Sequence, residues 1–167
     1  MSFDIILAEP QHQTAINDLL EHCFGPGRLA RTAERLREGN VPIGELSHLA
    51  MDDKNAIVGA ISFWPIRIGD APALLLGPLA VHHAMQGQGV GLRLMQAGLQ
   101  AIDAARFPHV LLVGDLPYYA RIGFEIAPPS IAMPGPVDAA RLLLRGADMG
   151  AYGDALSGMV RPAPDLC

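Results

Sequence analysis

Three glycines at alternate positions, 87, 89 and 91, give this chain its clearest sign of a binding site. They follow an apolar stretch, Ala73 to Val81, that predicts a strand. The apolar residues after them are spaced for one face of a helix: Leu92, Met95, Leu99 and Ile102. A glycine-rich turn into a helix leaves N–H groups unpaired at the positive end of the helix dipole, and a phosphate can approach them without meeting a Cβ. The spacing favours a phosphate-binding loop over an ordinary tight turn.

Two common phosphate-binding fingerprints do not fit this loop. The dinucleotide motif G-x-G-x-x-G requires a glycine where the chain has Leu92, and a P-loop requires Lys and Ser or Thr after Gly91. A dinucleotide-binding domain keeps one supporting residue, Asp115, which follows a predicted strand where a ribose-binding acid would lie. The antiparallel hairpin expected before the loop argues against it, because a doubly wound sheet has helices there.

A second stretch that could do chemistry is Tyr118-Tyr119-Ala120-Arg121-Ile122-Gly123-Phe124. Tyr119 lies 28 positions beyond Gly91 (119 − 91), after a predicted helix and a predicted strand. A phenol is protonated at neutral pH, so it can donate a hydrogen bond or a proton to a leaving group. The alternative is that the ring of Tyr119 only packs beneath the sheet while its hydroxyl reaches solvent.

Together the two stretches resemble the GNAT superfamily of N-acetyltransferases. Residues 86–91 match every fixed position of its Gln/Arg-x-x-Gly-x-Gly/Ala motif, and residues 118–124 resemble its aromatic-Tyr-x-x-x-Gly-Phe motif. The resemblance covers about residues 3 to 145 and is nearest to a bacterial branch with unknown substrates. It implies transfer of an acetyl group from acetyl-CoA to a primary amine, by direct attack of the amine on the thioester.

The resemblance also implies roles for individual residues. Tyr119 would protonate or hydrogen-bond the leaving thiolate of CoA, and a backbone N–H near Val81 would face the charge that develops on the thioester oxygen. Pro78 fits a bulge at which the fourth strand separates from the fifth and the pantetheine arm enters. The residues expected to bind the cofactor are Leu79, Ala80, Val81, Gln86, Gly87, Gln88, Gly89, Val90, Gly91 and Arg93.

The base that would deprotonate the amine is not evident, because the predicted fourth strand carries no acid. The candidates are His82, His48, Glu45 and Glu21, beside an amine that binds neutral and gives its proton to water. The missing base leaves a second hypothesis open, a non-catalytic module that binds or senses acyl-CoA. The acceptor is expected to be a small-molecule or peptide amine, bound near residues 24–45. Arginines in that segment could favour an anionic acceptor or form the solvent face of a helix.

Composition narrows the classes of protein. The 167 residues carry a net charge of −5, which argues against a general nucleic-acid binder. No apolar run is long enough to cross a membrane and no signal peptide is evident, and the two cysteines favour a reducing cytoplasm. Cys23 is expected on the buried face of a helix, as a core residue and not as a nucleophile. No metal is expected, because the adjacent His82 and His83 would point to opposite faces of an extended chain.

The expected fold is α/β, a mixed sheet of six to seven strands flanked by about four helices, in a single domain over residues 1–167. Helices are predicted after Pro10, over Leu29–Glu38 with Leu29, Ala33 and Leu36 inward, after the glycine loop, and over Leu116–Ile122 with Asp115 as its cap. Strands are predicted at 3–8, 46–51, 56–68, 73–81, 109–114, 124–127 and 141–144. Residues 128–136 are expected to be a loop and 147–167 mostly irregular. The apolar segment Met149 to Val160 would either close the core or form a homodimer contact.

Overall fold

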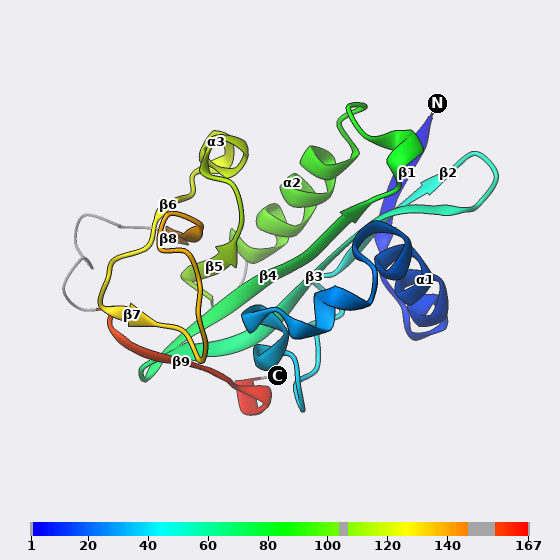
Figure 1. The fold of residues 1–167 in the computed structure, drawn as a ribbon. Coiled ribbons are helices and arrows are strands. Elements are labelled where there is room, and N and C mark those ends of the chain that lie inside the picture. Colours follow the sequence, from blue (N-terminus) through cyan, green and yellow to red (C-terminus); the bar gives the residue numbers. More distant parts are fainter. Residues whose placement is uncertain (1, 104–106, 147–155, 167) are drawn as a thin grey trace. The chain divides into compact units, whose positions relative to one another are not determined.

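A computed structural model of the protein describes residues 2–103, 107–146 and 156–166 (Figure 1). The chain divides into two compact units. The first consists of Met1–Leu29, Pro42–Phe63 and Gly77–Ala105, and the second of Ala30–Val41, Trp64–Leu76 and Arg106–Cys167. Two long strands, β3 (Ile57–Ile68) and β4 (Ala71–Val81), contribute residues to both units. The single domain over residues 1–167 stays a prediction.

The strands of the first unit are hydrogen-bonded in the order β1, β2, β3, β4. β1 (Phe3–Leu7) is antiparallel to β2 (His48–Asp52), and β2 is antiparallel to β3. The predicted hairpin turn after β2 is closed by Asp52, whose carboxylate accepts hydrogen bonds from the backbone N–H groups of Lys54 (2.9 Å) and Ala56 (2.8 Å). An aspartate that binds its own following backbone in this way is typical of a tight turn.

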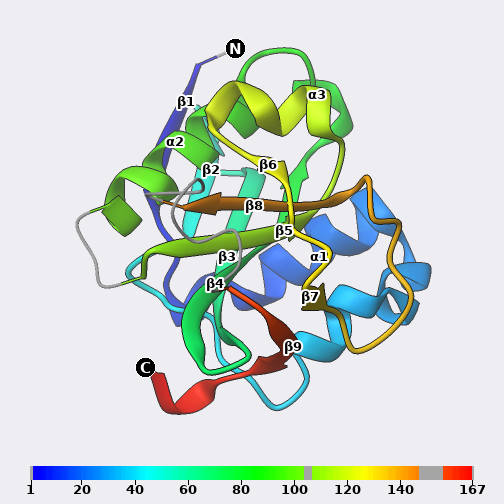
Figure 2. The same cartoon turned by 90° about the vertical axis from the view of Figure 1, so that its left-hand side faces the viewer.

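Helix α1 (Gln13–Phe24) covers one face of these strands (Figures 1 and 2). It is preceded by the short 3₁₀ helix η1 (Pro10–His12), so the proline begins the helical segment as predicted. It ends at Gly25, whose φ of 64° is readily available only to glycine. The residues buried between α1 and the strands are Ile16, Leu19, Leu20, Leu49, Ala60 and Ala80.

Helix α2 (Val90–Asp103) covers the opposite face of the same strands. Gly59 neighbours Ala60 in β3 and therefore faces the other way, and a Cβ at Gly59 would lie only 2.8 Å from Val90 Cγ1. Further along, Gly98 of α2 lies against the ring of Phe63, so closely that a Cβ at this position would overlap the ring. Two glycines, one on the strand and one on the helix, therefore allow α2 to approach the sheet.

Replacing Gly98 by valine is expected to destabilise the protein by about 1–3 kcal/mol, because the added carbons force the Phe63 ring or the helix to move. Denaturant unfolding of the wild type and the variant measures the difference. Gly44→Val is the control, since a Cβ at Gly44 meets nothing within 4 Å. Equal unfolding midpoints for the two variants would contradict this account of the α2 packing.

The strands of the second unit are ordered β3, β4, β5, β8, β6, and β9 pairs with both β3 and β7. β5 (His109–Val113) is parallel to β4 at Leu74 and Leu75, whereas β8 (Leu142–Gly146) is antiparallel to β5. The other strands are β6 (Glu125–Ile126), β7 (Ile131–Ala132) and β9 (Gly158–Pro162). Parallel and antiparallel pairs thus occur together, which confirms the predicted α/β fold with a mixed sheet.

The helix predicted over Leu29–Glu38 is wrong. The structure has two short 3₁₀ helices instead, η2 (Pro26–Ala30) and η3 (Thr32–Leu36). Arg31 between them is extended, with φ −72° and ψ 144°, so no continuous helix can form. Leu36 is fully buried as expected, but Leu29 is 58% exposed. The spacing of the apolar residues would put them on one inward face only if the segment were a continuous α-helix.

The C-terminal segment is more regular than predicted. Within residues 156–166 the chain forms β9 and the 3₁₀ helix η6 (Pro164–Leu166). β9 pairs with β3, where Val160 lies opposite Ile68 and is buried, while Met159 is 52% exposed. This part of the predicted Met149–Val160 segment therefore closes the core of its own unit. Residues 147–155 lie outside the described residues.

Three smaller predictions also need correction. The described residues form nine strands, not six or seven, and one of them, β7, lies in the predicted loop 128–136. The helix predicted over 116–122 consists of α3 (Leu116–Tyr119) and η5 (Ala120–Ile122). The side chain of Asp115 does not cap it, because its carboxylate accepts from Arg141 Nε at 3.2 Å.

Within the described ranges, no helix has the length and apolar character needed to cross a membrane.

Candidate active site

The glycine loop joins the short 3₁₀ helix η4 (His83–Met85) to α2. Gly87 and Gly89 have φ angles of 78° and 80°, and a Cβ at either would meet no atom within 4 Å. Both glycines are therefore needed for the backbone conformation and not for packing. Gly91 differs from them: it lies buried in the first turn of α2 and its φ is not positive.

The loop presents a row of unused backbone donors. In the described residues, the N–H groups of Gly87, Gly89, Val90 and Gly91 have no backbone acceptor, and Gln88 N–H donates only a long bond of 3.4 Å to Met85 O. These donors lie at the start of α2, a helix of 14 residues, where the helix dipole adds positive potential. Amides arranged in this way bind an anion such as a phosphate group.

The two glutamines of the loop bind backbone oxygens before it. Gln86 Nε2 donates to Val81 O at 3.4 Å, and Gln88 Nε2 donates to Ala84 O at 3.1 Å. Gln86 therefore ties the loop to the end of β4, and Gln88 ties it to η4. Arg93 contacts β1 instead: its guanidinium carbon lies 4.7 Å from the centre of the Phe3 ring, and its Nη1 is 3.5 Å from Phe3 O.

At the end of β4, the backbone groups of one residue do not face β3. His82 N–H donates to Val58 O of β3 at 2.8 Å, and successive residues of a strand direct their N–H and C=O groups to alternate sides. The N–H and C=O groups of Val81 therefore point away from β3. Its oxygen accepts from Gln86 and, at 3.5 Å, from the thiol of Cys23. Burial raises the pKa of the Cys23 thiol, which keeps this donor protonated. Of the neighbouring residues, Ala80 is in the core beneath α1 and Leu79 is half-buried.

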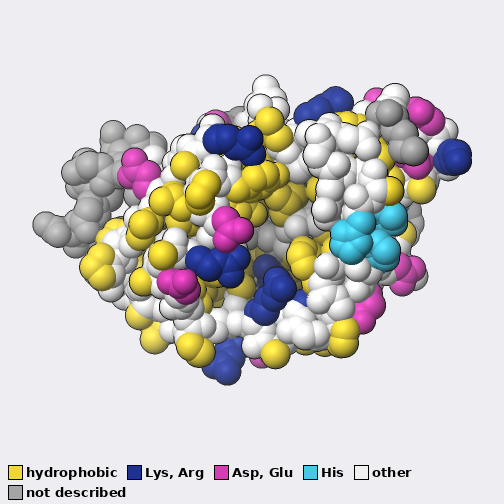
Figure 3. Space-filling model, turned by 45° about the horizontal axis from the view of Figure 1, so that its top comes forward, with side chains coloured by type: hydrophobic (Ala, Val, Ile, Leu, Met, Phe, Trp, Pro, Cys, Tyr) yellow, Lys and Arg dark blue, Asp and Glu magenta, His cyan; other side chains and the backbone are white. Residues whose placement is uncertain are grey.

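The rings of His22, His82 and His83 lie together where α1 ends beside the loop, and histidine side chains form one patch on the face shown in Figure 3. The ring of His22 is stacked on His82 at 4.4 Å between centroids and tilted against His83 at 4.9 Å. The prediction that His82 and His83 point to opposite sides is wrong, because His83 begins η4 and the chain is no longer extended. His82 Nδ1 accepts from Ala84 N–H at 3.2 Å, and stacked rings do not direct their nitrogens to one point. Among the described residues no group of side chains is arranged to hold a metal ion.

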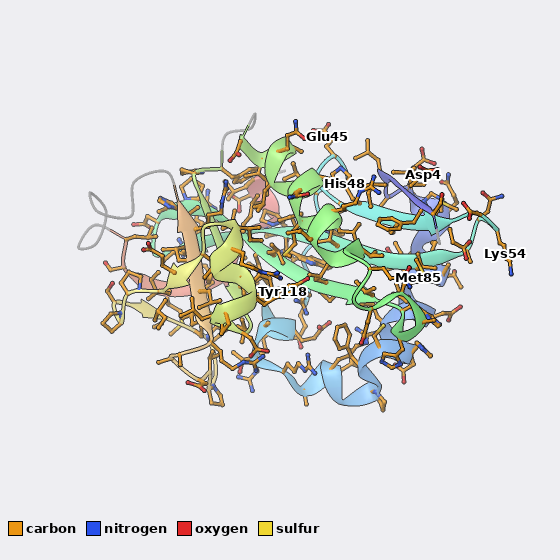
Figure 4. All side chains as sticks on the ribbon, turned by 90° about the horizontal axis from the view of Figure 1, so that it is seen from above. Asp4, Glu45, His48, Lys54, Met85 and Tyr118 are labelled. Carbon is orange, nitrogen blue, oxygen red and sulfur yellow. The ribbon has the colours of Figure 1, made fainter. Side chains whose placement is uncertain are left out.

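None of the four candidate bases has an arrangement that singles it out. His48 lies two residues before Ala50, which faces α2, so it is on the α2 side of the sheet, and its Nδ1 contacts Leu46 O at 2.7 Å (Figure 4). Glu45 and Glu21 are exposed. The ring of His82 is engaged with His22.

Tyr119 belongs to the second unit, where it ends α3. Its ring packs edge-on against buried Phe124 (5.9 Å between centroids) and against Tyr118 (5.0 Å), and it covers Gly114 so closely that a Cβ there would overlap it. Gly123, with φ 89°, supplies the turn that brings Phe124 back beneath the ring. The sequence pattern Tyr-x-x-x-Gly-Phe is therefore a device that fixes the orientation of the tyrosine.

The environment of Tyr119 changes its acidity. Burial, helped by the neighbouring Tyr118 and the carboxylate of Asp115, raises the pKa of Tyr119 to about 12, and Arg141 opposes the shift. The phenol is therefore protonated throughout the range in which enzymes are assayed. It is a hydrogen-bond donor and not a base.

Two residues at this site carried no signal in the sequence. His22 and Cys23 reach the end of β4 from α1, and Cys23 is 58 residues away from its partner Val81. Cys23 is half-buried, so the expectation that it belongs to the core is met only in part. No local pattern reveals a contact over this separation, because it depends on how α1 packs across β2, β3 and β4.

Comparison with known proteins matches these features to one family. A family model described as an acetyltransferase (GNAT) domain matches residues 44–126, which include both the glycine loop and the tyrosine stretch. The uncharacterized N-acetyltransferase YhbS of Escherichia coli strain K12 is 31% identical over 121 residues, 71% of each protein. The uncharacterized N-acetyltransferase YjhQ of the same strain is 30% identical over 138 residues, 80% of this chain and 76% of YjhQ.

Solved structures agree with the sequence relatives. E. coli YhbS in complex with CoA superposes with a TM-score of 0.77 at 24% identity, over 98% of this chain and 91% of that one. A GNAT family acetyltransferase from Brucella melitensis in complex with acetyl-CoA has a TM-score of 0.63 at 27% identity, over 87% and 97%. The chain therefore belongs to the GNAT family of N-acetyltransferases and is an acyltransferase enzyme.

Proposed function

We propose that the protein transfers the acetyl group of acetyl-CoA to the primary amine of a small molecule or peptide. The observation that carries this proposal is the row of N–H groups in the loop, of which those of Gly87, Gly89, Val90 and Gly91 have no backbone acceptor, and which suits the two linked phosphates of CoA. The CoA and acetyl-CoA present in the E. coli and Brucella structures support the same cofactor here. The cysteine content agrees with a cytoplasmic enzyme.

In this proposal the cofactor lies along the end of β4. The loop amides from Gln86 to Gly91 hold the pyrophosphate, and the backbone of residues 79–81 binds the pantetheine arm. The N–H of Val81, which points away from β3, donates to the thioester oxygen. Arg93, whose guanidinium contacts Phe3 in the structure, stays a predicted contact of the cofactor.

The reaction is a single transfer. The amine nitrogen attacks the carbonyl carbon, a C–N bond forms, the C–S bond breaks, and CoA leaves as a thiolate. The nitrogen loses one proton to water, and the thiolate is reprotonated from solvent at low pH or remains ionised at high pH. We assign no side chain as base, so the amine has to bind in its neutral form, and the rate rises with pH as more of it is neutral.

Tyr119 is the proposed catalytic residue. Its pKa decides whether it protonates the leaving thiolate or only donates a hydrogen bond to it. Its pKa is about 12, whereas a thiol has a pKa near 8.5. Complete transfer of the phenolic proton to the thiolate would be uphill by about 5 kcal/mol, at about 1.4 kcal/mol for each pKa difference of one. Tyr119 therefore stabilises the developing thiolate by donating a hydrogen bond to the sulfur.

A two-step experiment tests the proposal. First, the melting temperature is measured with acetyl-CoA, CoA and NAD, since a ligand at a hundred times its Kd stabilises the folded state by about 2.7 kcal/mol. Second, release of the CoA thiol is followed with a panel of primary amines. Stabilisation by both CoA species and not by NAD, with amine-dependent thiol release, is the expected result.

Two other results would contradict the proposal in different ways. Stabilisation by NAD alone would mean that the loop binds a dinucleotide. Stabilisation by acetyl-CoA with no thiol release from any amine, across small molecules and peptide N-termini, would favour a module that binds acyl-CoA without turnover.

A further inference from the structure

Arg28, in η2, is the one arginine of the described residues that has no partner. Its Nε atom is buried without a hydrogen-bond acceptor, and its guanidinium forms no ion pair or ring contact with the other residues that the structure describes. The others are engaged with carboxylates, carbonyl oxygens, rings or other groups: Arg31, Arg35, Arg37, Arg67, Arg93, Arg121, Arg141, Arg145 and Arg161.

A half-buried arginine without a partner calls for an explanation. A guanidinium stays charged, and burying one of its N–H groups without an acceptor is unfavourable. Arg28 is half-buried, and the acids of the preceding helix, Asp18 and Glu21, are exposed and do not pair with it in the described structure. The chain therefore keeps a charged, partly desolvated donor whose acceptor is missing, as expected of a group that meets a ligand.

The local chain path limits how far Arg28 can lie from the reacting end of the cofactor site. Cys23, at the end of α1, is hydrogen-bonded to Val81 O, and Val81 is the residue whose N–H we assign to the thioester oxygen. Arg28 follows Cys23 by five residues, a span of at most about 17 Å even when fully extended. The turn at Gly25 shortens it, since Arg28 N–H donates back to Gly25 O at 3.4 Å.

We propose that Arg28 binds an anionic group of the amine acceptor, a carboxylate or a phosphate. The substrate class is then an amine that carries an acidic group, such as an amino acid or an aminoalkyl phosphate. The planar fork of a guanidinium fits two oxygens of such a group at once, which fixes the amine at a set distance from the anion. This inference rests on the proposed acetyl transfer, since it names the acceptor of that reaction.

The test compares matched amines with and without the acidic group: phosphoethanolamine against ethanolamine, and glycine against glycinamide. For the wild type, kcat/KM is expected to be at least tenfold higher with one of the anionic members than with its neutral partner. Arg28→Gln should lower kcat/KM for that amine by about 10–100-fold and leave the neutral amine and the KM for acetyl-CoA unchanged. Amine basicity differs within each pair, but it is the same for the wild type and Arg28→Gln acting on one amine, so it cancels in the comparison of the two proteins. The pair that shows the larger difference, phosphoethanolamine with ethanolamine or glycine with glycinamide, tells whether the acidic group is a phosphate or a carboxylate.

Two further variants separate recognition from a structural role. Arg161→Gln removes an exposed arginine that pairs with Asp70, and should leave all four amines unaffected. Arg28→Met removes the unpaired donor while keeping the apolar stem, so its melting temperature should be equal to that of the wild type or about 2–4 °C higher. A marked loss of stability in Arg28→Met would instead make Arg28 a structural residue.

Calorimetric titration of the protein–CoA complex with the same amines provides a readout that does not need turnover. Binding of an anionic amine that is lost in Arg28→Gln supports the inference even if thiol release fails, in which case the acetyl transfer alone is overturned. No preference for an anionic amine in the wild type, in binding or in rate, overturns the role of Arg28. A raised KM for acetyl-CoA in Arg28→Gln with the amine preference intact would overturn it too, and assign Arg28 to the cofactor.

Discussion

Replacing Tyr119 by phenylalanine is expected to lower kcat roughly 100-fold while the Kd for acetyl-CoA stays within twofold of the wild-type value. Loss of one preorganised donor to a developing negative charge has about this effect on the rate. The ring would be retained, and with it the packing on Phe124 and beneath Gly114, so the fold should not change. Steady-state thiol release gives kcat, and calorimetry gives the Kd.

The pH dependence of the same reaction follows from the acidity of Tyr119. Because burial raises the pKa of its phenol to about 12, the donor is lost only as the pH rises through that value. Between pH 6 and 10 the wild-type rate should climb with deprotonation of the amine and show no fall that Tyr119→Phe removes. A descending limb near pH 8 or 9 that disappears in the variant would mean that the tyrosine acts in another way.

Tyr118→Phe is the matched control for this prediction. Tyr118 precedes Tyr119, and its half-buried ring packs against Tyr119 and against the guanidinium of Arg121, contacts that a phenylalanine ring keeps. Loss of the Tyr118 hydroxyl should change kcat by less than about threefold, because substitutions away from the reacting atoms have small effects. Equal losses in the two variants would mean that the pair acts by packing and that neither hydroxyl takes part in catalysis.

Replacing Gly89 by valine should weaken acetyl-CoA binding by about 10–100-fold, because a β-branched residue is strongly disfavoured at the φ of 80° found there. The substitution clashes with nothing in the folded chain, since a Cβ at Gly89 has no neighbour within 4 Å. The expected result is therefore a rearranged loop in which the donors no longer converge. The Kd from calorimetry measures the effect, and kcat at saturating cofactor should fall much less.

Gly39→Val separates this loss from the general strain of such a substitution. Gly39 has a φ of 66° and also has open space around its Cβ position, but it lies far from the loop in the sequence. It should lower the melting temperature about as much as Gly89→Val and leave the Kd unchanged. Similar cofactor affinities for the two variants would remove the loop from the phosphate site.

The sequence predicted those parts of the site in which neighbouring residues act together. The glycine loop and the Tyr-x-x-x-Gly-Phe stretch are local devices, and their φ angles and ring contacts follow from residues only a few positions apart. Even there, the three glycines appeared equivalent, whereas the structure separates the two with positive φ from Gly91 within the helix. The distinction depends on where α2 begins, which the spacing alone does not determine.

The failures share a physical cause, which is that the deciding partner is distant in the chain. Cys23 contacts the last residue of β4, and His22 contacts the histidine that follows it, each across about 60 positions. β9 is a strand because it pairs with β3 and β7, which are distant in the sequence. Arg28 looked like one of several arginines on the solvent face of a helix. Only the folded chain shows that the neighbouring arginines have partners and that Arg28 has none among the described residues.

The division of the chain into two units has a consequence for how such a protein can evolve. Six segments alternate between the units, so the backbone passes from one to the other five times, and two of those passages lie within β3 and β4. Neither unit corresponds to a continuous stretch of the gene. Duplicating, losing or exchanging one unit alone would therefore require changes at several separate places in the gene.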